Sequence, residues 1–396
     1  MTPRYAQRMA QVQPSAIGEL LALGADPSIT SFGGGYPDAT LFPAGALDAV
    51  FHEIITAPGG AAMQYAPSNG LARLRDQVAG LMQADGLAAC TGDDVLILQG
   101  SQQGLDFVAR MLVDPGDVIV TEDPTFLGAL IAFAPSQPDY AVVPVDADGM
   151  QTDQLETLLA AQPRAKMIYT IPDFQNPTGV TLSLERRKAL IALANRYDLI
   201  VVEDTPYRHI RFAGLNLPTL KSLDTEGRVI HLGSFSKILV PGLRIGWAVA
   251  NPDLLARMGQ LKVAADTQTS TLNMAAASLF LDRYDLTAHI ATLRAAYATK
   301  KEAMLDAIRR HFPQEIHATD PAGGLFTWLT FPQGFDTTEF MRNVALPMAK
   351  VAYVPGATFF PLTPRANHAR LNFSAPSLAA IETGIAALGR ALKTHL

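Results

Sequence analysis

Lys237 stands in a segment whose residue types could hold a phosphate beside a reactive amine. The segment reads Ser234-Phe235-Ser236-Lys237, and Arg244 follows seven positions after the lysine. A primary amine condenses with an aldehyde to form an imine, and burial or a nearby cation lowers the lysine pKa enough to supply the free amine. Serine hydroxyls can donate hydrogen bonds to phosphate, and arginine binds it bidentately. Taken alone, the segment is equally consistent with an exposed lysine and arginine after a strand.

Two further segments place polar side chains directly after predicted strands. An apolar run ends at Asp204, and Tyr207 follows three residues later. A second apolar run precedes the turn 172–179, which contains Asn176. Because the carboxyl ends of buried parallel strands open on a ligand crevice, we expect these three side chains to meet there. A carboxylate in this place could keep the nitrogen of a pyridine ring protonated, as pyridoxal phosphate chemistry requires.

With these motifs in this order, the chain resembles the fold-type I pyridoxal-phosphate aminotransferases of class I/II. The motifs are Asn-Pro-x-Gly from Asn176, Glu-Asp-x-x-Tyr ending at Tyr207, and Ser-x-Ser-Lys-x-x-x-x-Gly-x-Arg ending at Arg244. The resemblance runs from about Ser31 to Ser374 and is greatest for the branch with 2-aminoadipate and kynurenine aminotransferases and MocR-like regulators. It implies a pyridoxal 5'-phosphate (PLP) cofactor, a three-layer α/β/α large domain with a mostly parallel seven-stranded sheet, and a smaller α+β domain.

The resemblance also implies a role for each matching residue. Lys237 would be the catalytic residue, forming the imine with the cofactor and carrying protons. Asp204 would pair with the ring nitrogen, and Asn176 and Tyr207 would bind the ring oxygen. The other implied cofactor-binding residues are Tyr65, Ser101, Gln102, Phe126, Ser234, Ser236 and Arg244. The implied substrate-binding residues are Gly35, Asn176 and Arg370, the last binding the substrate alpha-carboxylate.

Independent physical arguments support part of this assignment. The strand-like run 95–99 and the amphipathic run 105–113 flank the segment 100–104, so helix N-terminal amides would attract an anion there. Ser101 could equally be a plain N-cap. Arg370 lies in an alternating run, so an exposed strand arginine is its alternative, and the glycines around Gly35 could form a simple turn.

Two aromatic residues extend the resemblance. Phe126 matches the aromatic residue that stacks on the cofactor ring, although a core phenylalanine would look the same in sequence. Tyr65 matches the tyrosine that reaches the phosphate of the partner subunit, although a tyrosine in a turn containing Pro67 and Asn69 is otherwise unremarkable. If Tyr65 has this role, the protein is a homodimer with shared active sites.

One departure from the family pattern concerns the substrate. The members that use acidic substrates often carry a basic residue in an N-terminal Ile-Arg-Glu-Leu-Leu helix. The stretch 16–21 has Gly18 at that position. We therefore expect a neutral, apolar or aromatic amino donor, unless another cation such as Arg8 substitutes.

Composition excludes several other classes of protein. The net charge is -6 and no basic run is present, which disfavours nucleic-acid binding. No apolar stretch approaches the roughly 18 residues of a membrane span, and the N-terminus lacks the apolar core of a signal peptide. The single cysteine, Cys90, permits no intrachain disulfide and fits a reducing compartment, so we expect a cytoplasmic protein. The eight histidines show no metal-ligand spacing.

Strand-like and helix-like segments alternate through the middle of the chain, which favours a mostly parallel sheet flanked by helices. The predicted strands are 95–99, 118–121, 140–144, 166–171, 199–203, 228–232 and 244–250, with helices between them such as 184–197. A long helical stretch, 281–310, then precedes strands near 324–331 and 351–354. We expect an N-terminal segment 1–35 on the small domain, a large domain 36–285 and a small domain 286–396.

The function that follows is transfer of an amino group between an L-amino acid and a 2-oxo acid by a ping-pong mechanism. A beta-lyase or decarboxylase on the same fold is the nearest alternative, because it would use nearly the same cofactor contacts. A PLP-binding sensor of the MocR-like class is a second alternative. Those regulators carry a basic helix-turn-helix segment ahead of this region, whereas only about thirty residues precede Gly33 here. We therefore expect an enzyme.

Overall fold

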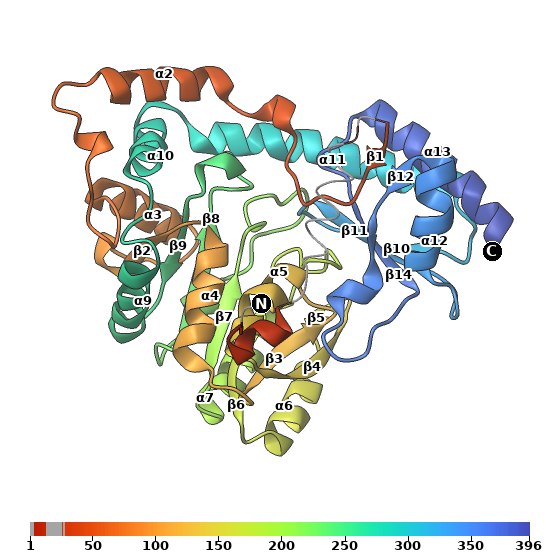
Figure 1. Ribbon diagram of the computed structural model, residues 1–396, viewed down its shortest axis with the longest axis horizontal. Helices are drawn as coiled ribbons and strands as arrows, with labels where there is room; N and C mark the ends of the chain where they lie inside the picture. The colour runs from red at the N-terminus through yellow and green to blue at the C-terminus, as the bar shows by residue number, and fades with distance from the viewer. Residues whose placement is uncertain (1–3, 13–25, 27) are drawn as a thin grey trace.

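The structure is a computed structural model that describes residues 4–12, 26 and 28–396. The two larger of its three β-sheets, each with its own helices, lie side by side, and long helices run along one edge of the molecule (Figure 1). The helices are α2 (Ala44–Thr56), α3 (Ala72–Ala84), α4 (Ser101–Leu112), α5 (Leu127–Phe133), α6 (Thr152–Ala161), α7 (Leu184–Arg196), α8 (Leu220–Leu223), α9 (Pro252–Ala265), α10 (Thr271–Arg283), α11 (Leu286–His311), α12 (Thr337–Phe340) and α13 (Leu378–His395).

The larger sheet has the strand order β2-β9-β8-β7-β6-β3-β4-β5. Its strands are β2 (Val95–Leu98), β3 (Val118–Asp123), β4 (Asp139–Asp146), β5 (Gly149–Met150), β6 (Ala165–Thr170), β7 (Ile200–Asp204), β8 (Val229–Ser234) and β9 (Gly246–Val249). Neighbours from β4 to β8 are parallel, whereas β9 is antiparallel to both β8 and β2. All seven predicted strands are present, and β5 is a short eighth strand that pairs with β4 and was not predicted.

Both faces of this sheet are covered by helices, which makes three layers. Successive strand residues pack into different cores: Val202 joins a core with α4, and Val201 joins a core with α6 and α7. Because each face is buried, strands such as β2 are apolar throughout instead of alternating. The predicted three-layer arrangement is confirmed.

A smaller antiparallel sheet lies at the other end of the molecule (Figure 1). Its strand order is β10 (His317–Ala318), β11 (Phe326–Thr330), β14 (His368–Asn372) and β13 (Val354–Pro355), and helices α11 and α13 pack together beside it. Close by, β1 (Thr30–Ser31) pairs in parallel with β12 (Val351–Ala352). This region is the predicted smaller α+β part of the chain.

The N-terminal segment divides between the two regions. Residues 30–31 pair with β12, and the amide of Asn372 donates to the carbonyl of Phe32 at 2.7 Å. The 3₁₀ helix Gln7–Gln11, in contrast, contacts the short helix Ala134–Ser136 beside the large sheet. The division of the chain at residues 36 and 286 therefore stays a prediction.

Three predicted elements have different limits in the structure. The strand predicted at 244–250 begins only at Gly246, because Arg244 has a left-handed backbone with φ 54°. The predicted helical stretch 281–310 is interrupted, because the Asp285 carboxylate accepts from the first amides of α11 and starts a new helix there. The strand predicted at 351–354 is two short strands separated by Tyr353.

The described residues offer neither a helix suited to a membrane nor a cluster suited to a metal ion. None of the helices within residues 4–12 and 28–396 combines the length and the apolar character that crossing a membrane demands. The same residues contain no group of three or more His, Cys, Asp or Glu side chains arranged to hold a metal ion. Cys90 is buried, and burial raises the pKa of its thiol to about 11.

Candidate active site

A cavity of about 310 Å³ lies between the large sheet and the small sheet. The strands β6, β7 and β8 end at it, and β14 contributes a side chain from the opposite side. Its wall contains every residue predicted for the site except Tyr65, namely Gly35, Ser101, Gln102, Phe126, Asn176, Asp204, Tyr207, Ser234, Ser236, Lys237, Arg244 and Arg370.

Lys237 is held just beyond the end of β8. The neighbouring Phe235 is fully buried and packs against Trp247 with ring centroids 4.9 Å apart, which anchors this turn to β9. The Lys237 ammonium donates to the carbonyl oxygen of Gly35 at 2.7 Å. Burial, aided by the charges of Arg370 and Arg244, lowers the pKa of Lys237 to about 8. An appreciable fraction of the side chain is therefore a free amine near neutral pH.

Asp204, the last residue of β7, presents a carboxylate oxygen without a partner. Its Oδ2 accepts a hydrogen bond from the Tyr169 hydroxyl at 3.1 Å, whereas Oδ1 has no partner among the described residues. Burial raises the pKa of Asp204 to about 7. A buried carboxylate is costly unless it is paired. A protonated ring nitrogen in the cavity would supply the missing donor, so this residue fits a pyridinium group.

Arg370 links the small sheet to the end of β6. One guanidinium nitrogen donates to the Asn176 amide oxygen at 2.8 Å, and the other donates to the Gly33 carbonyl at 2.7 Å. The guanidinium lies over the ring of Phe326, 4.1 Å from its centroid, and burial lowers the pKa of Arg370 to about 10. Asn176 in turn donates from its amide nitrogen to the Tyr207 hydroxyl at 3.3 Å. These contacts orient all three polar groups on one cavity wall.

Hydrogen-bond donors gather at the opposite end of the cavity. Helix α4 begins there after Gly100, and no side chain caps its first amides. Gly100 has φ 73°, a backbone conformation that residues with side chains rarely adopt, so this position favours glycine. The Ser234 hydroxyl donates to that of Ser236 at 2.8 Å. Free amides, hydroxyls and a guanidinium together suit a phosphate group.

The two predicted aromatic residues have different environments. Phe126 is half-buried on the cavity wall. Tyr65 is 82% exposed and lies outside the cavity of its own chain. Gly18 and the stretch 16–21, on which the substrate prediction rests, lie outside the described residues.

The family model for aminotransferase class I and II matches residues 36–388. The chain belongs to this family. Family membership makes it an aminotransferase, as the motifs predicted, and implies a pyridoxal phosphate cofactor.

Relatives that match nearly the whole chain are also named as aminotransferases. The aminotransferase is 37% identical over 397 residues to aromatic-amino-acid aminotransferase 1 of Thermococcus litoralis, covering 99% of this chain and 94% of that one. Among solved structures, it is similar to alpha-aminoadipate aminotransferase LysN of Thermus thermophilus in complex with N-(5'-phosphopyridoxyl)-L-leucine, with 36% identity, a TM-score of 0.92 and 98% and 97% of the two chains covered. It is also similar to Pyrococcus horikoshii kynurenine aminotransferase, with 36% identity and a TM-score of 0.93, and the match covers 99% of this chain and 97% of that one.

Among the residues around the aminotransferase site that were not predicted from sequence, three aromatic residues contact predicted side chains. Tyr169 binds Asp204, and Phe359 and Phe326 lie against Arg370. A tyrosine in a buried strand needs a partner for its hydroxyl, and this rule could have directed attention to Tyr169. The two phenylalanines carry no such local signal, because both are distant from Arg370 in sequence. Phe326 reaches it through the pairing of β11 with β14, and Phe359 reaches it from the 3₁₀ helix Gly356–Phe359.

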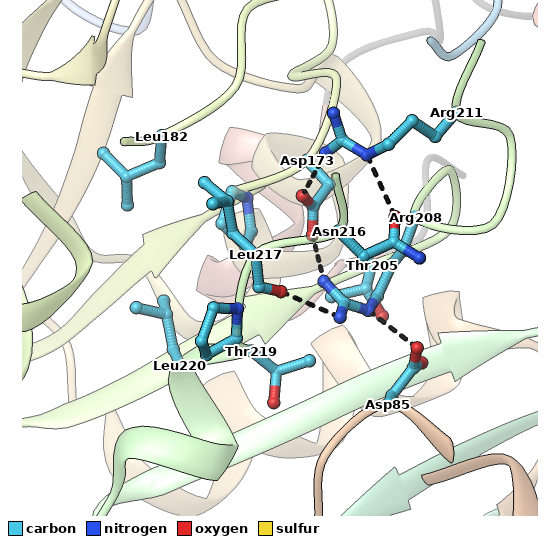
Figure 2. A network of polar contacts seen from close by, with 12 residues as sticks. Asp85, Asp173, Leu182, Thr205, Arg208, Arg211, Asn216, Leu217, Thr219 and Leu220 are labelled. Carbon is cyan, nitrogen blue, oxygen red and sulfur yellow. Dashed lines mark hydrogen bonds and ion pairs between the residues drawn. The ribbon is translucent and has the colours of Figure 1, made fainter. Parts of the chain in front are cut away.

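A buried ionic network lies beside the cavity, and Figure 2 shows its members Asp173, Arg208 and Asp85. Asp173, fully buried, accepts from Arg187 at 2.8 Å, from Arg208 at 3.0 Å and from Arg211 at 3.3 Å. Arg208 also pairs with Asp85 at 3.1 Å.

This network spans two polar loops of the site. Asp173 lies three residues before Asn176, and Arg208 directly follows Tyr207. The ion pair between Asp173 and Arg208 therefore fixes the spacing of the two side chains that meet in the cavity. Removal of the Asp173 carboxylate would leave the buried Arg187 without an ion-pair partner among the described residues, which is strongly destabilising.

Proposed function

We propose that this aminotransferase uses Lys237 as its catalytic residue, with PLP as the cofactor and L-amino acids and 2-oxo acids as substrates. The observation that carries the proposal is the cavity itself, where a lysine with a lowered pKa, an unpartnered carboxylate oxygen and a group of phosphate-type donors face one another. PLP, when bound, supplies an aldehyde for the amine and a ring that accepts electrons.

At the ring end, the chain would bind and orient the cofactor. Asp204 would hold a proton on the ring nitrogen with its free Oδ1, while Tyr169 fixes the other oxygen. Asn176 and Tyr207, already hydrogen-bonded to each other, would both face the ring oxygen. Phe126 would stack on the ring from the side of α5.

At the phosphate end, the backbone amides of Ser101 and Gln102 would donate hydrogen bonds to the phosphate. The Gln102 side chain is already used, because its amide nitrogen donates to the Gly128 carbonyl at 2.7 Å. Ser234, Ser236 and Arg244 would complete the phosphate contacts.

The exposure of Tyr65 supports a role outside its own cavity. We propose that Tyr65 of one protomer reaches the phosphate bound by its partner, in a homodimer with shared active sites. A fully active monomer at assay concentration, detected by sedimentation, would exclude this arrangement.

On the substrate side, Arg370 would bind the alpha-carboxylate bidentately. Its Nε has no partner among the described residues, and its bond to Asn176 keeps the guanidinium on the cavity wall beside Gly35. Lys237, as the free amine, would take the proton from the substrate alpha carbon and return it. The Gly35 carbonyl, which accepts from the Lys237 nitrogen at 2.7 Å, would orient this amine while it is free.

We further propose a neutral, apolar or aromatic amino donor. Leu127, Val354 and Phe359 line the cavity with apolar surface. The related alpha-aminoadipate aminotransferase LysN is in complex with N-(5'-phosphopyridoxyl)-L-leucine, and the leucine group of that ligand supports the proposal of an apolar donor. Position 18 is a glycine and not a basic residue, which also favours a neutral donor.

A half-reaction screen tests the proposal. Purified protein loaded with PLP is mixed with each of a panel of L-amino acids, and the absorbance of the bound cofactor is followed. An aminotransferase yields one 2-oxo acid per site and then stops until a second 2-oxo acid restores the original spectrum. Continuous release of ammonia or carbon dioxide without a second substrate would instead identify a beta-lyase or a decarboxylase.

A further inference from the structure

Lys262, near the end of α9, is a buried lysine outside the cavity wall. Its side chain is fully buried, yet its ammonium has four acceptors. These are the two Asp266 oxygens at 3.1 and 3.0 Å, the Gln103 amide oxygen at 3.1 Å and the Thr269 hydroxyl at 2.9 Å. Ion pairs with one or both partners buried are weak evidence for stability, because desolvation offsets much of the attraction. The main effect of this cluster is therefore to fix the relative positions of the segments that it joins.

The first of these segments is the turn between β2 and α4. Gln103 lies in the first helical turn, directly after the two residues whose amides were assigned to phosphate. Its amide oxygen accepts from the backbone amide of Gln99 at 2.9 Å, and its amide nitrogen donates to Asp266 at 2.8 Å. Lys262 binds the same Gln103 oxygen. The lysine and Asp266 thus fix the side chain that closes the turn 99–103.

The second segment carries Tyr65. Asp266 accepts at its backbone carbonyl from the amide of Gln268 at 2.6 Å. The side-chain oxygen of Gln268 then accepts from the amide of Ala66 at 2.5 Å. Ala66 directly follows Tyr65, so a continuous chain of hydrogen bonds connects the turn 99–103 to the segment that faces outward.

We propose that Lys262 is a positioning residue for phosphate binding, which holds the turn 99–103 and the Tyr65 segment in register. The inference rests on the proposed function, because it takes the phosphate contacts assigned there as given. Lys262 itself touches neither cofactor nor substrate. Its effect should therefore appear in the affinity for the phosphate group and leave the ring contacts at Asp204 and Asn176 unchanged.

The test compares PLP with pyridoxal, which has the same ring and aldehyde but no phosphate. The dissociation constant of each is measured by absorbance titration of the cofactor-free, full-length protein, for the wild type and for Lys262→Met. We expect the variant to bind PLP about tenfold more weakly or worse, the scale seen when a residue that orients a metal-binding side chain is removed, and to bind pyridoxal as the wild type does.

Lys301→Met is the matched control. Lys301 is also buried and paired with an aspartate, Asp320, at 2.6 Å, but neither residue lines the cavity. This variant should bind both aldehydes as the wild type does. If Lys262→Met does not fold, Asp266→Asn keeps the side-chain size, removes the charge and should show the same selective loss.

Three results would overturn the inference, and they can be told apart. A wild-type protein that binds pyridoxal as well as PLP would remove the phosphate assignment of the proposed function and the inference with it. A wild type that prefers PLP, together with a variant of unchanged preference, would remove the inference alone. Equal weakening of both ligands would show that Lys262 supports the fold generally and has no specific effect on phosphate.

Discussion

The two halves of the cavity are built in different ways. The large-sheet half places Lys237, Asp204 and Asn176 at the ends of three adjacent strands, with buried networks behind them. The small-sheet half consists of Arg370 and the segment 33–35. It meets the first half through the bond from Arg370 to the Asn176 side chain and the bond from Lys237 to the Gly35 carbonyl. The difference suggests a division of function, in which the first half catalyses the reaction and the second half recognises the substrate. Changes in the first half should then abolish turnover, and changes in the second should alter affinity and selectivity.

The largest effect is expected at Lys237. Lys237→Ala removes both the amine that attaches the cofactor and the group that moves the proton, so turnover should fall by about 10⁴-fold or more. Steady-state assays with the best donor give the result. PLP should remain bound without a covalent link, because the phosphate contacts are intact. Near-normal turnover would contradict the division between the halves.

Asp204→Asn should produce the second largest loss. A neutral amide cannot hold the proton on the ring nitrogen, so the half-reaction rate should fall by about 10²- to 10³-fold, the scale for losing a group that stabilises developing charge. Rapid-mixing absorbance measures this rate, and circular dichroism checks the fold. If the variant kept its rate, the assignment of Asp204 would have to be withdrawn.

Arg370→Lys probes the small-sheet half. A lysine keeps the charge but loses the bidentate geometry, which costs about 1.5–3 kcal/mol, or about tenfold to a hundredfold in kcat/KM for the amino donor. The affinity for PLP should not change. Arg365→Lys is the control, because Arg365 lies in the same region but does not line the cavity. A loss of PLP affinity as large as the loss in kcat/KM would break the proposed division.

Selectivity among amino donors provides a further test of the proposed division of function. The wild type should not use glutamate or 2-aminoadipate better than leucine, methionine or phenylalanine. Gly18→Arg should shift the kcat/KM ratio towards the acidic donors by about tenfold, through one charge-assisted hydrogen bond. Kinetics on both proteins decide this. A wild type that clearly prefers 2-aminoadipate would show that another cation, such as Arg8, supplies the contact.

The smallest effect concerns pH. Only the free amine of Lys237 attacks an aldehyde, and burial lowers its pKa to about 8. The rate at which PLP attaches to the cofactor-free protein should therefore rise with pH and level off once the pH exceeds about 8. Stopped-flow absorbance across this range provides the test. A midpoint near 10.5, the ordinary lysine value, would contradict the buried environment.

Residues after strand ends were the ones that sequence alone could place. Lys237, Asp204 and Asn176 each follow an apolar run, and parallel strands bring such ends together, so their meeting could be predicted. The contact of Arg370 with Phe326 could not, because it depends on how β11 and β14 pair over 40 residues of chain. Tyr65 shows a different limit, since its proposed partner belongs to another molecule.

Local backbone geometry and helix capping explain other differences between the predicted and the observed limits of strands and helices. Arg244 adopts a left-handed backbone at the phosphate end, so the predicted strand 244–250 starts two residues late. Asp285 starts a new helix where the hydrophobic pattern continues without a break. Both effects depend on single hydrogen bonds or dihedral angles, which a periodic pattern of apolar residues does not report.

The most direct test of the account is to locate the cofactor on the chain. The protein is loaded with PLP, reduced with borohydride, digested and mapped by mass spectrometry. We predict a single modified peptide with the phosphopyridoxyl group on Lys237, and no modification of the buried Lys262 or Lys301. A reduced adduct on any other lysine, or none at all under conditions where donors are converted, would contradict the central assignment.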